Sequence, residues 1–321
     1  MNITGPKDRD FLMHVRREDY DADLVEIIEG NRGRIDELLQ QFGVMIFKGY
    51  GVDGAEKLRQ VAHAFSQNLL SYNERAAPRK EAGDRVYTST EFPKEESIPL
   101  HHEMSYSYNY PRYLYFCCAV PAESGGITPV ADDRVVISKI PKRLKDKFVA
   151  KKILYVRNFG TGLDMEWRTA FQTDSKADVE KYLTDNRTRF TWHSDRWLET
   201  QFMADPIVEH PQTKELLWFN HAHLFHSSNL PHDVRAALVD EFSERGLPRN
   251  AFYGDGDAIE DDCLQMIRDI YAAHAIGEKW ERGDCMLIDN MRCVHGRKPY
   301  RGARQIYVCM SDLLNRDVAC A

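Results

Sequence analysis

The feature that most constrains this chain is a histidine and a glutamate one residue apart, followed far along the sequence by another histidine. His101 and Glu103 lie in the stretch 98–128, and His295 lies in the motif DNMRCVHGRKPYRGAR. Residues i and i+2 of a β-strand point to the same side, so we expect the His101 and Glu103 side chains to converge. Two histidines and one carboxylate on one face of Fe(II) form the facial triad of non-haem oxygenases, which leaves coordination positions open. The pattern therefore predicts an iron site.

Taken alone, the His-x-Asp/Glu pattern is weakly specific. Twelve histidines and 50 acidic residues among 321 give about two chance matches, and the chain has two, the pair above and His193-x-Asp195. His221 and His223 form another candidate pair. Each set could equally be ordinary polar residues of a surface strand, so the surrounding sequence must decide.

Composition sets the class of protein and excludes several kinds of partner. A chain of 321 residues, 43% hydrophobic and 29% charged, fits a soluble globular protein with a substantial core. The net charge of −7 offers no basic surface for nucleic acid or anionic lipid. Seven cysteines without a CxxC pair indicate reduced thiols, and the charged N-terminus lacks the apolar segment of a signal peptide. No apolar run approaches the roughly 18 residues of a membrane span, so we expect a cytoplasmic protein.

Hydrophobic periodicity predicts a mixture of helices and short strands. We expect helices over 23–42 with an interruption near 30–33, and over 54–70, 142–151, 175–183, 231–245 and 259–275. We expect extended segments over 44–47, 85–90, 100–105, 113–120, 286–289 and 305–311. The chain has no internal repeat and no linker rich in Pro, Gly or Ser, so we predict a single domain over 1–321.

Six motifs in chain order carry a resemblance to a known family. They are VYTSTEFP (86–93), LHHEMSY (100–106), GGITPVADDR (125–134), VEHPQTKELLWFNHAHLFHSS (208–228), YGDGDAI (253–259) and DNMRCVHGRKPYRGAR (289–304). With these motifs, the chain resembles the taurine dioxygenase/clavaminate synthase-like superfamily of Fe(II)/2-oxoglutarate oxygenases. The nearest likeness is to bacterial enzymes that hydroxylate amino acids or related units in natural-product biosynthesis.

The resemblance implies a fold. It is mainly β with flanking helices (α+β), around a double-stranded β-helix core of the jelly-roll or cupin-like kind. The core would occupy about 42–313 of a single oxygenase domain, with a large helical insert over about 140–275 between core strands.

The resemblance also implies the residues of the site. His101, Glu103 and His295 would bind iron, while Thr128, just after a Gly-Gly turn, and Arg304 would hold the distal carboxylate of 2-oxoglutarate. Arginine suits this role because its guanidinium forms a bidentate pair with a carboxylate, which lysine cannot do.

Arg297 and Arg301 are alternatives to Arg304 for the co-substrate carboxylate. Arg304 is favoured because it opens the final predicted strand, whereas Arg301 lies in a turn with Gly302. Relatives often have asparagine where this chain has His102, and we expect His102 to point away from iron.

The function implied is that of an enzyme that uses Fe(II), 2-oxoglutarate and O2. It would oxidise an unactivated C–H bond, most simply by hydroxylation, and release succinate and CO2. Halogenating relatives replace the metal-binding carboxylate with a small residue, so Glu103 favours hydroxylation, desaturation or cyclisation. Two alternatives stay open: another cupin-type metal enzyme that does not use 2-oxoglutarate, and a non-catalytic β-helix binding protein.

Polar residues near the expected pocket suggest the substrate class. Thr90, Asn220 and His221 suit a polar small molecule, and we expect an amino acid or amino-acid-derived intermediate, either free or carrier-bound. Among His221, His223 and His226, we expect one or two hydrogen-bonding core or pocket residues rather than metal ligands. The sequence does not decide the substrate or the oligomeric state, and a homo-oligomer is compatible with it.

Overall fold

The fold is built around a seven-stranded sheet with the strand order β1-β2-β15-β6-β18-β4-β3. Its strands are β1 (Leu12–Arg16), β2 (Val44–Lys48), β3 (Glu81–Gly83), β4 (Val86–Thr88), β6 (Asn109–Val120), β15 (Cys285–Asp289) and β18 (Gln305–Asn315). A computed structural model describes the chain over residues 11–17, 22–72, 74, 79–89, 92–163 and 165–317. Only β1 and β2 pair in parallel within this sheet as described, and its other neighbouring strands are antiparallel.

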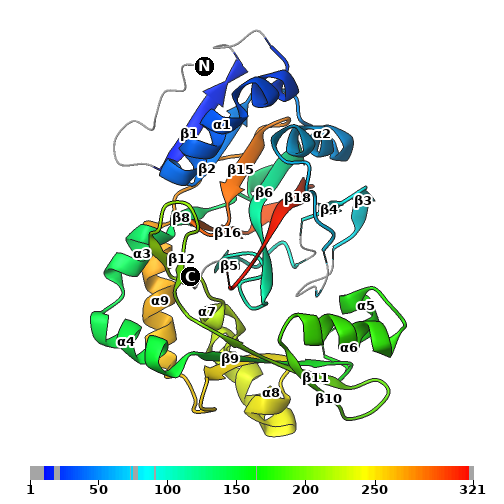
Figure 1. The fold of residues 1–321 in the computed structure, drawn as a ribbon, viewed down its shortest axis with the longest axis vertical. Coiled ribbons are helices and arrows are strands. Elements are labelled where there is room, and N and C mark those ends of the chain that lie inside the picture. The colour runs from blue at the N-terminus through cyan, green and yellow to red at the C-terminus, as the bar shows by residue number, and fades with distance from the viewer. Residues whose placement is uncertain are drawn as a thin grey trace.

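Two helices cover one face of this sheet, α1 (Leu24–Phe42) and α2 (Ala55–Phe65). Alternate residues of the central strand β6 explain why: Tyr113, Tyr115 and Cys117 pack in one apolar cluster with both helices. The residues between them face the opposite way into a separate cluster. The two helices therefore close one end of the molecule (Figure 1) and leave the other face of the sheet for the site.

A three-stranded sheet packs against that other face. Its order is β5 (Ile98–His101), β16 (Cys293–Arg297) and β8 (Val130–Asp132). Cys293 and Val130 from this sheet share a buried cluster with Phe116 of the large sheet. The register places His295 directly opposite His101. His101 and His295, far apart in sequence, are thus neighbours on adjacent strands of the smaller sheet.

The region over 140–275 is mixed rather than helical, which corrects the expected helical insert. It contains α4 (Lys142–Lys151), α5 (Trp167–Phe171), α6 (Lys176–Asp185), α7 (Ala222–Phe225), α8 (His232–Gly246), α9 (Asp261–His274) and a 3-10 turn, η2 (Ser227–Asn229). It also contains a four-stranded antiparallel sheet of β10 (Arg189–Trp192), β11 (Leu198–Ala204), β9 (Ile153–Phe159) and β14 (Arg249–Tyr253). Strand β9 is buried at every residue and pairs on both edges, and its apolar first half, ILYV, suits the centre of a sheet. This sheet and α8 lie at the end of the molecule opposite α1 (Figure 1).

The remaining elements are short connections. They are α3 (Asp133–Lys139), β7 (Ser124–Gly125) paired with β17 (Tyr300–Arg301), and β12 (Val208–Glu209) paired with β13 (Leu216–Leu217). The predicted helices and core strands outside the insert agree with the structure to within a few residues, apart from the segment after His101. Among the helices that the structure describes, none is long and apolar enough to cross a membrane.

Candidate metal centre

The structure brings together the two histidines and the glutamate of the sequence pattern. His101, Glu103 and His295 each offer a ligand atom, and the three atoms lie within 4.8 Å of one another. The imidazole rings of His101 and His295 have centroids 4.5 Å apart. His101 comes from β5 and His295 from β16, so the cross-strand register of the smaller sheet sets their spacing.

Glu103 reaches this group by a different route from the one predicted. Strand β5 ends at His101, and Glu103 lies in the turn that follows, next to Met104 with a positive φ of 58°. The Glu103 N–H donates to Oδ1 of Asn290 at 2.7 Å, and Nδ2 of Asn290 donates to the Glu103 carbonyl at 3.0 Å. The predicted convergence of the His101 and Glu103 side chains is present. It comes from an anchored turn, because the extended segment expected over 100–105 ends at His101.

The protonation states of these groups suit a divalent metal. Burial lowers the pKa of both His101 and His295, which keeps the imidazoles neutral. The Nδ1–H of His101 donates to the Pro99 carbonyl at 2.8 Å, and Nε2 is then left with its lone pair. Burial acts to raise the pKa of Glu103, but the charge of Arg79 and the hydrogen bonds from Tyr72 and Arg79 outweigh it and hold this pKa below its ordinary value. Two neutral imidazoles and one carboxylate are a donor set that fits Fe(II).

Thr128 and Arg304, the two residues predicted to bind 2-oxoglutarate, line a cavity beside the metal group. It is lined by Arg79, Ser89, Ile98, His101, Phe116, Thr128, His295, Gly296, Arg297, Arg304 and Ile306. Arg304 Nε donates to the Gly126 carbonyl at 3.0 Å, and its Nη2 lies 3.5 Å from Thr128 Oγ1. Gly126 has a φ of +69°, and a Cβ there would lie 3.1 Å from Arg304, so the turn requires glycine. Burial lowers the Arg304 pKa to about 10, which leaves the guanidinium charged at neutral pH.

The two rival arginines have other contacts. Arg297 donates to the carbonyls of Phe92 at 3.0 Å, Pro93 at 2.5 Å and Glu96 at 2.9 Å, so its guanidinium fixes the segment before β5. Arg301 is exposed on β17. Of the three, Arg304 is the one that contacts Thr128.

The competing histidine patterns do not form a metal group in the described structure. His193 pairs with Glu199 at 3.0 Å, its ring lies 4.2 Å from that of Trp197, and neither His193 nor Trp197 lines the cavity. His102 is fully buried, with Nδ1 2.6 Å from the Asn290 carbonyl, and is not a member of the group formed by His101, Glu103 and His295.

Of the three residues expected to bind substrate, the structure describes His221 and Asn220. His221 is buried, with Nδ1 3.0 Å from Ser105 Oγ and its ring 5.4 Å from that of His101. The Asn220 amide donates to the Pro206 carbonyl and accepts from the Ala222 N–H. Neither residue lines the cavity. Thr90 lies outside the described residues.

His223 and His226 are buried and hydrogen-bonded. Nε2 of His223 lies 2.7 Å from the Leu100 carbonyl, and Nδ1 of His226 lies 2.9 Å from Ser228 Oγ. Both have core roles in the described structure.

Sequence reasoning missed three residues of the site. Arg79 forms an ion pair with Glu103 at 2.7 Å, and Tyr72 donates its hydroxyl to the same carboxylate at 2.9 Å. Trp280 Nε1 donates to Thr128 Oγ1 at 3.0 Å. Arg79 stands in a charged stretch with no periodic signal, so its neighbours in sequence give no indication of its burial.

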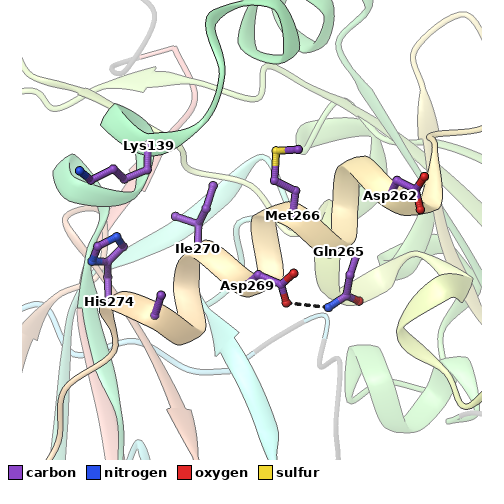
Figure 2. Close-up of a pocket in the computed structure, with 8 residues that line it drawn as sticks. Lys139, Asp262, Gln265, Met266, Asp269, Ile270 and His274 are labelled. Atoms are coloured by element: carbon purple, nitrogen blue, oxygen red, sulfur yellow. Dashed lines mark hydrogen bonds between the residues drawn. The ribbon is translucent and has the colours of Figure 1, made fainter.

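A separate hollow runs along α9 and the end of α3 (Figure 2). Its lining includes Lys139, Met266, Ile270 and His274, and Gln265 donates to Asp269 at 2.8 Å. It shares no residue with the cavity beside His101.

Comparison with known proteins identifies the family. Residues 8–310 match the family described as "Taurine catabolism dioxygenase TauD, TfdA family". The chain belongs to this family. It is 36% identical over 278 residues to the dapdiamide synthesis protein DdaC of Enterobacter agglomerans, which covers 87% of this chain and 84% of that protein. It is 29% identical over 296 residues to a clavaminate synthase-like protein of Arabidopsis thaliana, with 88% and 85% covered.

Solved structures share the fold at low identity. AAD-2 in complex with Mn(II) and N-oxalylglycine aligns with a TM-score of 0.56 at 13% identity, over 97% of each chain. A taurine dioxygenase from Burkholderia xenovorans aligns with a TM-score of 0.55 at 13% identity, over 99% of this chain and 92% of that one. The protein is thus an Fe(II)/2-oxoglutarate-dependent dioxygenase with a jelly-roll core, and the family resemblance of its motifs is confirmed.

Proposed function

We propose that the dioxygenase binds Fe(II) through His101, Glu103 and His295 and the distal carboxylate of 2-oxoglutarate through Thr128 and Arg304. The observation that carries this assignment is the cavity, because His101, His295, Thr128 and Arg304 all line it. A dicarboxylate bound between Arg304 and the metal ligands would satisfy both ends with opposite charge.

Each residue has a task that follows from its chemistry. The neutral imidazoles donate lone pairs, and the single carboxylate of Glu103 offsets part of the metal charge while leaving coordination positions open. Phe116, Ile98 and Ile306 give the cavity apolar walls that exclude water from the co-substrate. Fe(II) with 2-oxoglutarate and O2 supplies the oxidation of an unactivated C–H bond, with release of succinate and CO2.

The proposed reaction is hydroxylation of an amino acid or amino-acid-derived intermediate of natural-product biosynthesis, free or carrier-bound. The support is the 36% identity to a dapdiamide synthesis protein. His221 is the best placed of the three expected substrate residues, since its ring lies 5.2 Å from Tyr106 and beside His101. Asn220 would act by holding its loop. We further propose that residues 1–321 form a single oxygenase domain that acts in the cytoplasm.

Succinate release against a panel of amino acids and their thioesters tests this proposal. The enzyme is supplied with Fe(II), 2-oxoglutarate and O2, and succinate and product mass are measured together. Succinate formed in step with a product 16 mass units heavier, the mass of one oxygen atom, is the expected result. Oxygen uptake without succinate, or product formation that persists in His101→Ala, would overturn it.

A further inference from the structure

Both oxygens of the Glu103 carboxylate are already bound by protein donors. Arg79 Nη2 lies 2.7 Å from Oε2, and the Tyr72 hydroxyl donates to Oε1 at 2.9 Å. All three side chains are buried, and the Arg79 guanidinium lies over the Tyr72 ring at 4.7 Å. Each carboxylate oxygen has two lone pairs, so a metal ion that takes one oxygen of Glu103 either shares it with the donor already there or replaces that donor.

The two donors differ in how unfavourable it is to break their hydrogen bond to Glu103. Arg79 makes a charge-assisted bond inside the protein, and separating a buried cation from its carboxylate is strongly unfavourable. Tyr72 is a neutral donor, so its withdrawal leaves no buried cation unpaired, and Tyr106 lies within hydrogen-bonding reach of its hydroxyl as an alternative acceptor. Tyr106 in turn donates to the Glu74 carbonyl at 3.1 Å, so its oxygen can accept from Tyr72.

We propose that Arg79 is a positioning residue that remains on one oxygen of Glu103, while the metal takes the oxygen that Tyr72 contacts. The inference rests on the proposed role of Glu103 as a metal ligand. Arg79 would hold the carboxylate in a fixed direction, in the way that hydrogen-bond partners behind a ligand orient it.

Arg79 would also keep Glu103 to a single metal-binding oxygen. A carboxylate without this partner can offer both oxygens to one metal ion and occupy an additional coordination position. 2-Oxoglutarate and O2 need the positions that the three protein ligands leave open. Arg79 lines the cavity together with His101 and His295, so replacing Arg79 should also weaken the binding of the co-substrate there.

Mn(II) titration of the metal-free protein, followed by the EPR signal of the free ion, tests the division of roles. Arg79→Gln is expected to bind Mn(II) roughly 10- to 100-fold more weakly than the wild type, with Arg79→Lys between the two. Tyr72→Phe is expected to bind equally well or a few-fold more tightly, because it removes a competitor for the metal-binding oxygen. Arg143→Gln, an exposed arginine of α4, is the matched control and should leave the affinity unchanged.

A second readout uses metal-saturated protein under anaerobic conditions. The visible charge-transfer band that Fe(II) and 2-oxoglutarate give together should weaken in Arg79→Gln and persist in Tyr72→Phe. If Arg79→Gln does not fold, the inference still requires weaker Mn(II) binding in Arg79→Lys than in Tyr72→Phe.

Equal Mn(II) affinity and an equal band in the wild type and the Arg79 variants would overturn the inference. Weaker binding in Tyr72→Phe alone would do the same, because it would reverse the two roles. A wild type that binds no Mn(II) would instead contradict the proposed metal site, so the two failures are distinguishable.

Discussion

Asn290 holds the main chain of Glu103 at both of its polar groups. Its side-chain oxygen accepts from the Glu103 N–H and its side-chain nitrogen donates to the Glu103 carbonyl, 187 residues apart in sequence. The same nitrogen donates to the Pro111 carbonyl at 2.8 Å. One carboxamide between β15 and β16 therefore fixes the turn that carries the acidic residue of the candidate metal centre.

Asn290→Ala should both destabilise the protein and weaken metal binding. Three buried backbone groups lose their partner, and each unsatisfied group costs on the order of 1–3 kcal/mol, so a loss of about 3 kcal/mol or more is expected. Urea unfolding and Mn(II) titration measure the two effects. Asn229→Ala, which loses one bond to the Leu224 carbonyl, should leave Mn(II) affinity unchanged. Wild-type affinity in Asn290→Ala would contradict the role given to this anchor.

Replacement of either histidine of the centre should abolish metal binding. His101→Ala or His295→Ala removes one of three donor atoms that lie within 4.8 Å, and we expect loss of both bound Fe(II) and turnover. His193→Ala is the control, because His193 pairs with Glu199 in the other His-x-Asp/Glu pattern. Iron content and succinate formation measure the result. Loss of iron in His193→Ala alone would show that the assignment is wrong.

Thr128→Val should raise the KM for 2-oxoglutarate by about tenfold, which corresponds to the loss of a hydrogen bond to a charged group. The Thr128 oxygen accepts from Trp280 and lies near Arg304, so its own hydrogen is available to a carboxylate. Arg304→Lys should have a larger effect, because lysine cannot form the bidentate pair. Arg301→Lys, an exposed residue of β17, should leave KM unchanged. An unchanged KM in Arg304→Lys would assign the co-substrate carboxylate elsewhere.

The parts of the fold that depend on local sequence were predictable. The interruption expected near 30–33 appears as Asn31, whose φ of −131° and ψ of 17° break the helical geometry of α1. Asp23 caps this helix by accepting from the Val25 N–H, and Gly43 ends it with a φ of 86°. Capping, glycine placement and periodicity are all visible within a few residues of sequence.

The parts that depend on tertiary pairing were not predictable in the same way. Arg79 is buried because it meets Glu103, and nothing in the surrounding charged stretch marks it. Glu103 lies in a turn rather than in β5 because Asn290, far along the chain, binds its backbone. The sequence of β9 does not indicate that it pairs with β11 and β14. These pairings form the sheet that replaces part of the expected helical insert.

The stability of the protein should fall below neutral pH, and His223 accounts for part of the fall. Its Nε2–H donates to the Leu100 carbonyl at 2.7 Å, so a second proton would have to enter at Nδ1, which is buried without a hydrogen-bond partner among the described residues. Burial accordingly lowers the pKa of His223 to about 3. Between this value and the ordinary pKa of about 6.5, the unfolded chain binds a proton that the folded chain does not. Acidification in that window therefore favours unfolding.

Urea unfolding of the wild type and His223→Gln at pH 7 and pH 5 measures this contribution. Glutamine does not titrate and can still donate to the Leu100 carbonyl, so the wild type should lose about 2 kcal/mol more than the variant between the two pH values. The other histidines are the same in both proteins, so their contributions cancel in the difference. His232→Gln, whose side chain is 94% exposed, should lose as much as the wild type. Equal losses in the wild type and His223→Gln would mean that His223 accepts its proton in the folded state, and the buried Nδ1 would then need an acceptor.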